Sequence, residues 1–213
     1  MFIVYSCLSL LLCVFGAVIM SLEILSSSLM APYFGGSIYV WGSIISAFML
    51  HMSLGYVLGG YLAKKNGSLA ALAWLLSLAS TCLVFIPIIH RPLCELISDR
   101  IADIRLGSLM AMFILSSPVV IMSMISPYII GVFSMHNRDR SGLNAGLVLL
   151  TSTVGSFLGT NITAFYLISV FPVSRIIISL GIIGLCISVV IFSFRIDRRL
   201  LTTLGKEETT PKL

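Results

Sequence analysis

The sequence predicts an all-α integral membrane protein with six transmembrane helices. Hydrophobic residues make up 58% of its 213 residues and charged residues only 10%, a composition far more apolar than that of a soluble domain. Mean hydropathy is +1.10. Six apolar segments are each long enough to supply the roughly 20 helical residues that cross a bilayer core. Most basic residues lie at the ends of these segments, where they orient helices.

The six segments and a short tail account for the whole chain. The predicted helices span 5–31, 38–62, 68–89, 106–131, 142–168 and 173–194. Together they form one membrane domain, 1–194, followed by a cytoplasmic tail, 195–213.

The first segment and the loop after the third need separate arguments. The first segment has no basic stretch before it and stays apolar past Met20, so it is interpreted as a membrane helix rather than a cleaved signal peptide. The loop 90–105, HRPLCELISDRIADIR, carries Pro92 and apolar residues on one helical face. It is expected to form a short helix lying on the membrane surface.

The charges of the loops predict the orientation. With the N-terminus inside, nine lysines and arginines fall on the cytoplasmic side and four outside, which favours cytoplasmic N- and C-termini in the cell (inner) membrane. The nine are Lys64, Lys65, Arg138, Arg140, Arg195, Arg198, Arg199, Lys206 and Lys212. Basic residues placed this way do not form a nucleic-acid-binding patch, so no nucleic-acid partner is expected. The five cysteines lack metal-ligand spacing, and no metal, cofactor or disulfide framework is expected.

The two halves of the chain resemble one another. Pro32-Tyr33 follows the first helix and Pro127-Tyr128 closes the fourth, while SLGYVLGG at 53–60 matches TVGSFLGT at 153–160. Because three spans separate the copies, the second copy must cross the membrane in the opposite sense. The pattern predicts an inverted 3+3 repeat, with two halves related by an axis in the membrane plane.

Small residues predict where helices approach closely. In the second helix Ser43, Ala47, His51, Gly55 and Gly59 recur every four residues and therefore share one face. The fifth helix offers a similar surface, and it is the expected partner. Its glycines are Gly142, Gly146, Gly155 and Gly159.

Glu23 and His51 are the strongest candidates for a substrate or proton pathway. Ionisable side chains inside a bilayer normally face the bundle interior or a water-filled path. Glu23 is either a proton carrier or substrate counter-charge, or a structural carboxyl that is kept protonated by desolvation or hydrogen-bonded to a neighbouring helix. His51 either has a functional role or simply bonds a backbone carbonyl. Asn144 and Asn161 are weaker candidates, because an amide near a helix end often only bonds across an interface.

Prolines and aromatic residues supply further expectations. Pro118 and Pro127 lie in the fourth helix and are expected either to open its backbone ladder or only to kink it. Trp41 is interpreted as an interface anchor, and Gly35 is expected to permit the turn after the first helix.

These residues carry a family resemblance. The run from Glu23 through Ala31-Pro32-Tyr33-Phe34-Gly35 to Ser37-x-Tyr39-x-Trp41, followed by Gly55-Tyr56-x-x-Gly59-Gly60, resembles the membrane domain of proteins that fuse a major-facilitator-like region to a spermidine-synthase-like domain. Ser126-Pro127-Tyr128 and the block 152–160 resemble a second part of the same domain. The resemblance covers about 15–195 and implies a bundle like half of a major facilitator fold.

The departures from the family limit what can be carried over. Members usually carry an arginine five residues after the glutamate, where this chain has Ser28, and an acidic residue shortly after the paired glycines, where it has Lys64. The tail after the sixth segment is too short for a synthase-like domain. The chain is therefore expected not to be an enzyme.

Two functions from different classes remain open. One is a small-solute transporter, completed by homodimerisation. The other is a non-catalytic membrane subunit or anchor for a separate synthase-like enzyme. A polyamine-related solute is implied only by the family resemblance.

Overall fold

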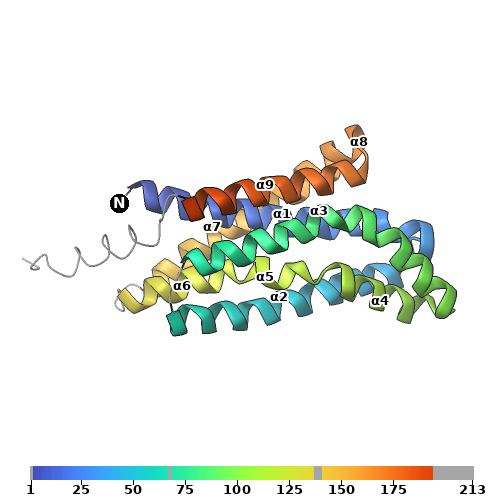
Figure 1. Cartoon of the computed structure of the whole chain (residues 1–213), viewed down its shortest axis with the longest axis horizontal. Coiled ribbons are helices and arrows are strands. Elements are labelled where there is room, and N and C mark those ends of the chain that lie inside the picture. The colour runs from blue at the N-terminus through green and yellow to red at the C-terminus, as the bar shows by residue number, and fades with distance from the viewer. Residues whose placement is uncertain (1, 67–68, 137–140, 194–213) are drawn as a thin grey trace, which may run out of the picture.

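The computed structural model describes residues 2–66, 69–136 and 141–193, and every regular element among them is helical (Figure 1). In chain order the elements are α1 Phe2–Phe34, α2 Ile38–Asn66, α3 Leu69–Arg100, α4 Ile104–Leu115, α5 Pro118–Ser123, α6 Ile125–His136, α7 Ser141–Ile162, the π-helical turn η2 Thr163–Leu167, α8 Ile168–Val170 and α9 Val173–Ser193. The predicted tail lies outside the described residues.

The described helices support a protein that crosses the membrane several times. Five helices are long and apolar enough to span a bilayer. A sixth span results if α4 is taken together with the segment Pro118–Ser134, from which it is bent by 54°. These elements overlap the six predicted segments one to one, although α3 extends past the predicted end at 89, and the fourth is the one that is broken.

The expectation of a separate surface helix at 90–105 is wrong. Helix α3 continues without interruption to Arg100, and α4 begins at Ile104. Pro92 lies inside α3. Proline removes only its own N–H from the ladder, and local adjustment keeps such a helix intact. Leu93 and Ile97, which were expected to face the membrane surface, instead pack against the core.

The helix ends gather at two ends of the bundle. The start of α1 and the α2–α3 and α6–α7 junctions lie together at one end, and α8 and the α3–α4 junction lie at the other (Figure 1). The first of these is here called the basic end, because Lys64 and Lys65 lie in the last turn of α2.

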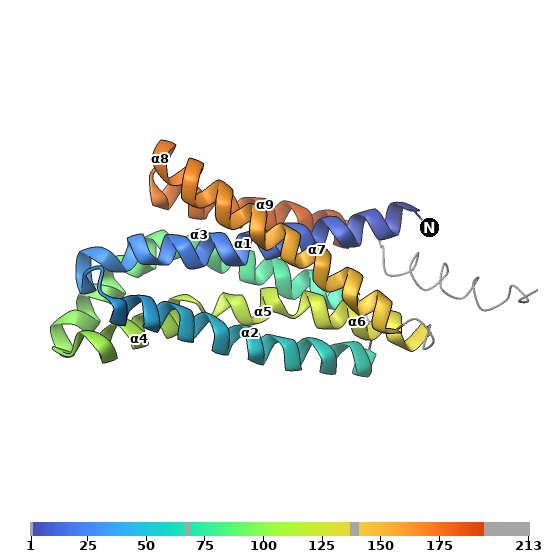
Figure 2. The same ribbon diagram turned by 180° about the vertical axis from the view of Figure 1, so that it is seen from behind.

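Two pairs of parallel helices build the framework. Helix α1 lies beside α7, and α2 lies beside the broken helix α4–α5–α6 (Figure 2). Both helices of each pair run in the same direction along the bundle. Helices α3 and α9 form a third, antiparallel pair.

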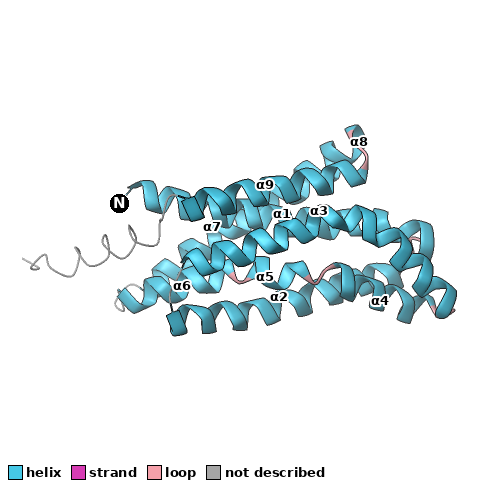
Figure 3. Cartoon of the chain, in the orientation of Figure 1, coloured by secondary structure: helices cyan, strands magenta, loops and turns pink. Residues whose placement is uncertain are grey.

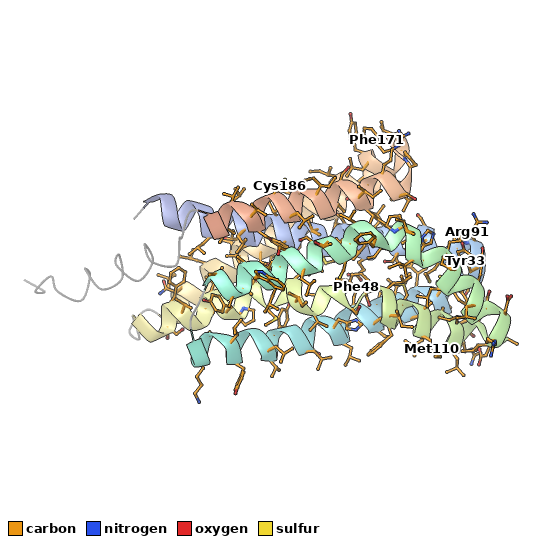
Figure 4. All side chains as sticks on the ribbon, in the orientation of Figure 1. Tyr33, Phe48, Arg91, Met110, Phe171 and Cys186 are labelled. Carbon is orange, nitrogen blue, oxygen red and sulfur yellow. The ribbon has the colours of Figure 1, made fainter. Side chains whose placement is uncertain are left out.

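Apolar side chains fill the interior of the bundle. Phe15 of α1 and Phe48 of α2 are each only 1% exposed, and Phe48 points between the helices in Figure 4. Large apolar side chains on α2 and α7 instead face outward, where lipid is an equally apolar neighbour. Association of the helices therefore depends on close packing and hydrogen bonds. Side-chain hydrogen bonds join the helices of the two parallel pairs, and α3 and α9 also pack closely, at Gly181 and Gly184.

Candidate functional site

The small-residue face of α2 packs along the whole broken helix. Ser43 Oγ lies 2.9 Å from Ser108 Oγ of α4. A Cβ atom added to Gly59 would lie 2.9 Å from the Met124 Cα and 2.9 Å from the Pro127 Cγ. The prediction that this face meets another helix closely is confirmed, but the predicted partner, the fifth helix, is wrong.

His51 ties α2 to the first break of that helix. The imidazole is 3% exposed, and its Nδ1 lies 2.9 Å from Ser116 Oγ. The Ser116 hydroxyl donates to the Met112 carbonyl at 2.6 Å, so it accepts a hydrogen bond from the Nδ1–H of the imidazole. The ring also packs 4.6 Å from that of Phe113, measured between centroids.

The break itself results from Pro118. Its missing N–H and its ring disfavour a helical continuation from Leu115, and the chain passes through a turn at Ser116–Ser117. The Val119 N–H then donates to the Ser116 carbonyl at 2.9 Å rather than to Leu115. Figure 3 shows this interruption and a second one between α5 and α6. The expectation that Pro118 opens the ladder is confirmed, whereas Pro127 lies inside the regular helix α6.

The second break contacts the next glycine of α2. A Cβ atom on Gly55 would meet Ser123 Oγ and the Val120 carbonyl. Ser123 Oγ also donates to the Met52 carbonyl of α2 at 3.4 Å. Met124 N–H bonds the Ile121 carbonyl at 3.2 Å, one residue nearer than in an α-helix. Only a residue without a side chain fits at Gly55, because the two backbones are in direct contact.

The glycines of α7 pack on α1 rather than on α2. Cβ atoms on Gly155 and Gly159 would meet the backbones of Cys13 and Ala17. By contrast, Cβ atoms on Gly142 and Gly146 would have no neighbour within 4 Å. The predicted packing role is therefore wrong for these last two, because nine residues separate Gly146 from Gly155 and this spacing puts the first two glycines on the opposite, exposed side of α7.

A hydroxyl chain joins α1 to the point where α7 becomes π-helical. Thr163 Oγ1 donates to Ser21 Oγ at 2.8 Å, and Ser21 Oγ donates to the Gly159 carbonyl at 3.2 Å. All three groups are buried. π-helical turns within α-helices are frequent at functional sites, and this turn lies on the opposite parallel pair from the break at Pro118.

Glu23 lies half-buried near the middle of α1. No hydrogen bond or ion pair joins its carboxylate to His51 or to another residue in the described part of the chain. The one ion pair among those residues is Arg91–Glu95 on the surface, with 3.0 Å between Arg91 Nε and Glu95 Oε1. Glu23 follows Ile19 by four residues and Met20 by three, so it continues the face of α1 that carries those two side chains.

A central cavity of about 180 Å³ lies on that face of α1, between the two parallel pairs. Its polar groups are hydroxyls alone. They belong to Tyr56, Ser123, Ser126, Ser152, Thr153 and Ser156. Glu23 lies one helical turn beyond the cavity residue Met20, about 4.5 Å along the α1 axis toward the end opposite the basic end. Sequence reasoning did not identify this cavity, although the hydroxyl residues near Gly155 and Gly159 were visible in the sequence.

An inner cavity of about 230 Å³ lies nearer the basic end, between α1, α6 and α7. Asn144 lines it together with Ser9 and Thr151. Of the predicted pathway residues, Asn144 therefore lines a cavity, whereas Glu23 and His51 line neither of the two. Asn161 bonds only its own helix, with Nδ2 donating to the Phe157 carbonyl at 2.7 Å.

The residues of the family resemblance do not form one site. Pro32 is exposed at the end of α1, and Tyr33 beside it stacks edge-on against His90 of α3, with 6.5 Å between ring centroids. Figure 4 shows Tyr33 and Arg91 together at this end of the bundle. Trp41 is 39% exposed on α2, and Gly35 adopts a φ of 77° in the turn before α2. Tyr128 is buried in α6, far along the chain from this turn.

The described residues form a helical bundle whose five or six long apolar helices are those expected of a multi-pass membrane protein. Within the described residues no group of three or more His, Cys, Asp or Glu side chains is arranged to hold a metal ion. No family model, curated protein or solved structure matches the chain. The resemblance to the fused major-facilitator and synthase-like proteins therefore rests on the quoted motifs alone.

Proposed function

We propose that this protein is a small-solute transporter in which the solute passes between the α1–α7 pair and the α2–α4–α5–α6 pair. The central cavity carries this proposal, because six hydroxyl-bearing residues at the middle of apolar helices surround it. A carboxylate lies one turn away on the same face of α1. Polar groups at this depth are costly in lipid and usually mark a solute or ion path.

The pairing of helices supports the inverted repeat that many transporters share. If helices one to three correspond to four to six, a contact between the second and fourth spans must recur between the fifth and first. Helix α2 packs on α4–α6, and α7 packs on α1. The third and sixth spans, α3 and α9, pack on each other, as corresponding helices can across an axis between the halves.

Individual contacts support the same correspondence. Gly55 and Gly59 align with Gly155 and Gly159 at an offset of 100 residues. The first two glycines contact Val120 and Met124, and the second two contact Cys13 and Ala17. The contacted residues are then related by one offset of 107, from 13 to 120 and from 17 to 124.

A third contact is related to its counterpart by the same two offsets, 100 and 107. A Cβ atom on Gly16 would meet the Ser152 carbonyl, and the corresponding pair is Ser123 with Met52, whose carbonyl accepts the serine hydroxyl at 3.4 Å. By these offsets Pro127 corresponds to Met20 rather than to Pro32. The repeated Pro-Tyr pairs are then a coincidence of sequence, whereas the repeated glycines are equivalent.

The orientation and a second copy complete the proposal. The basic end faces the cytoplasm, as the loop charges favour. The central cavity reaches the surface at Tyr56 and Leu149, which are 44% and 53% exposed on either side of it. A second copy inserted in the same orientation, related by an axis normal to the membrane, would cover this opening and enclose the solute.

Glu23 has the role of a proton carrier in this transporter. It has no cationic partner within 4.0 Å in the described part of the chain, and the arginine usual in the resembling family is replaced by Ser28. Such a carboxyl can take up and release a proton as the space beside it opens and closes to water.

The experiment compares the parent protein with Glu23→Gln in liposomes loaded with a metabolite extract, with and without a pH gradient. Glutamine keeps the shape and removes the titratable charge. We expect folded protein in both cases and loss of pH-driven exchange in the variant. If the parent protein exchanges no solute under any gradient, transport is rejected and the anchor for a separate synthase-like enzyme becomes the working hypothesis.

A further inference from the structure

The central and inner cavities adjoin at one side chain. Leu12 of α1 lines both, and it is 4% exposed. Along α1 the inner cavity is lined by residues 8, 9 and 12, and the central cavity by residues from 12 to 20. The two cavities therefore follow one another along the bundle, with the Leu12 side chain between them.

The inner cavity connects this space to the surface near the basic end. Ser9 is exposed, and Leu147 on α7 is 52% exposed. Both residues lie within about two turns of the start of the apolar span of their helix, at Leu8 and at Ser141. His51 and Ser116 join α2 to α4 directly, beside Met52, which lines the central cavity.

Four of the hydroxyls that line the central cavity have no hydrogen-bond partner among the described residues, whereas Ser123 donates to a carbonyl. Within the described residues, no hydrogen bond involves the hydroxyls of Ser126, Ser152, Thr153 or Ser156. A polar group left unpaired away from water costs about 1–3 kcal/mol. Ser126, Ser152 and Ser156 are half-buried and Thr153 is exposed, so these hydroxyls are free to bond water or a solute in the cavity.

The lining also restricts the charge of that solute. The polar lining groups of both cavities are hydroxyls and one amide, that of Asn144, and no carboxylate, lysine or arginine is among them. An ion moved from water into a site without a counter-charge pays a desolvation cost much larger than that of a neutral hydroxyl compound. Glu23 lies beyond the central cavity and does not line it.

We infer that the two cavities form one path from the basic end to the middle of the membrane, and that the path takes a small uncharged solute rich in hydroxyl or amide groups. This inference rests on the proposed transport function and names its substrate class. A volume of 180 Å³ holds about six water molecules at roughly 30 Å³ each. Leu12 is the constriction that the solute must pass.

The test measures solute entry into liposomes that contain the purified protein. Glycerol and erythritol are the neutral probes, and radiolabelled choline and lactate are the charged ones. We expect glycerol and erythritol to enter several-fold faster than into protein-free liposomes, and choline and lactate to enter at the protein-free rate. Leu12→Trp should abolish the protein-dependent entry. The matched control is Leu10→Trp, because Leu10 is 57% exposed on another face of α1.

The possible outcomes distinguish failure of the inferred path and substrate class from failure of the proposed transport function. Entry of choline or lactate without glycerol or erythritol would overturn the substrate class and leave transport standing. Entry of the neutral probes that Leu12→Trp and Leu10→Trp reduce equally would overturn the path. If none of the four probes enters and the metabolite exchange described above is also absent, the proposed function itself fails.

Discussion

Replacing Gly59 by alanine tests the close contact between α2 and the broken helix. The new Cβ would lie 2.9 Å from the Met124 Cα and 2.9 Å from the Pro127 Cγ, whereas carbon atoms in favourable contact lie about 3.5–4.0 Å apart. One of the two backbones must therefore retreat by about 0.6 Å or more. Overpacking of this kind costs about 1–3 kcal/mol.

Gly60 is the matched control, because it is the next residue of the same helix and a Cβ there would have no neighbour within 4 Å. Alanine raises helix propensity at either position by up to about 1 kcal/mol. That gain cancels in the comparison. We expect Gly60→Ala to be neutral or stabilising and Gly59→Ala to be less stable than Gly60→Ala by about 1–3 kcal/mol. Gly59→Leu should fail to fold.

The measurement is reversible unfolding in mixed micelles, followed by the fluorescence of Trp41 and Trp74, the two tryptophans of the chain. Equal stability of the two alanine variants would refute the contact. It would mean that α2 stands farther from α6 than the structure places it.

Buried serine hydroxyls give two further predictions. Ser80 Oγ is buried against Gly184 without a hydrogen-bond partner among the described residues, so Ser80→Ala should leave the free energy of unfolding unchanged or raise it. Ser108→Ala removes the bond to Ser43 and should lower the free energy of unfolding by about 1 kcal/mol. Equal losses in the same unfolding assay would contradict this difference between the two hydroxyls. A double-mutant cycle of His51→Phe and Ser116→Ala should yield a coupling of about 1 kcal/mol, and a coupling indistinguishable from zero would show that the 2.9 Å contact between these side chains contributes nothing.

The sequence predicted the elements of this fold more accurately than their partners. Apolar length and glycine spacing are local properties, so the six segments and the close-packing face around Gly59 could be read from residue order. Which helix meets that face depends on the position of every other helix. The predicted partner was the fifth helix, α7, whereas the actual partner is the broken helix α4–α5–α6. The break at Pro118 was expected because proline has a local effect, whereas the lining of the central cavity depends on side chains from α1, α2, α5, α6 and α7 at once.

The two offsets of the proposed repeat, 100 and 107 residues, relate the hydrogen-bonded contact at His51 to the inner cavity near the basic end. Applied to His51 and Ser116, they give Thr151 and Ser9. The first pair is joined by a 2.9 Å hydrogen bond on the side away from the basic end, and the second pair lines the inner cavity. Two inverted halves with identical side chains would have no reason to prefer either side. If the protein is the transporter proposed above, an imidazole, which reaches farther across an interface than a threonine hydroxyl, favours the state in which the His51 side is closed and the basic end is open. Opening in the other direction then requires that the His51–Ser116 bond break while Ser9 and Thr151 approach each other, an exchange that inverted halves permit without a change in the packing of Gly55 on α5 or of Gly155 on α1.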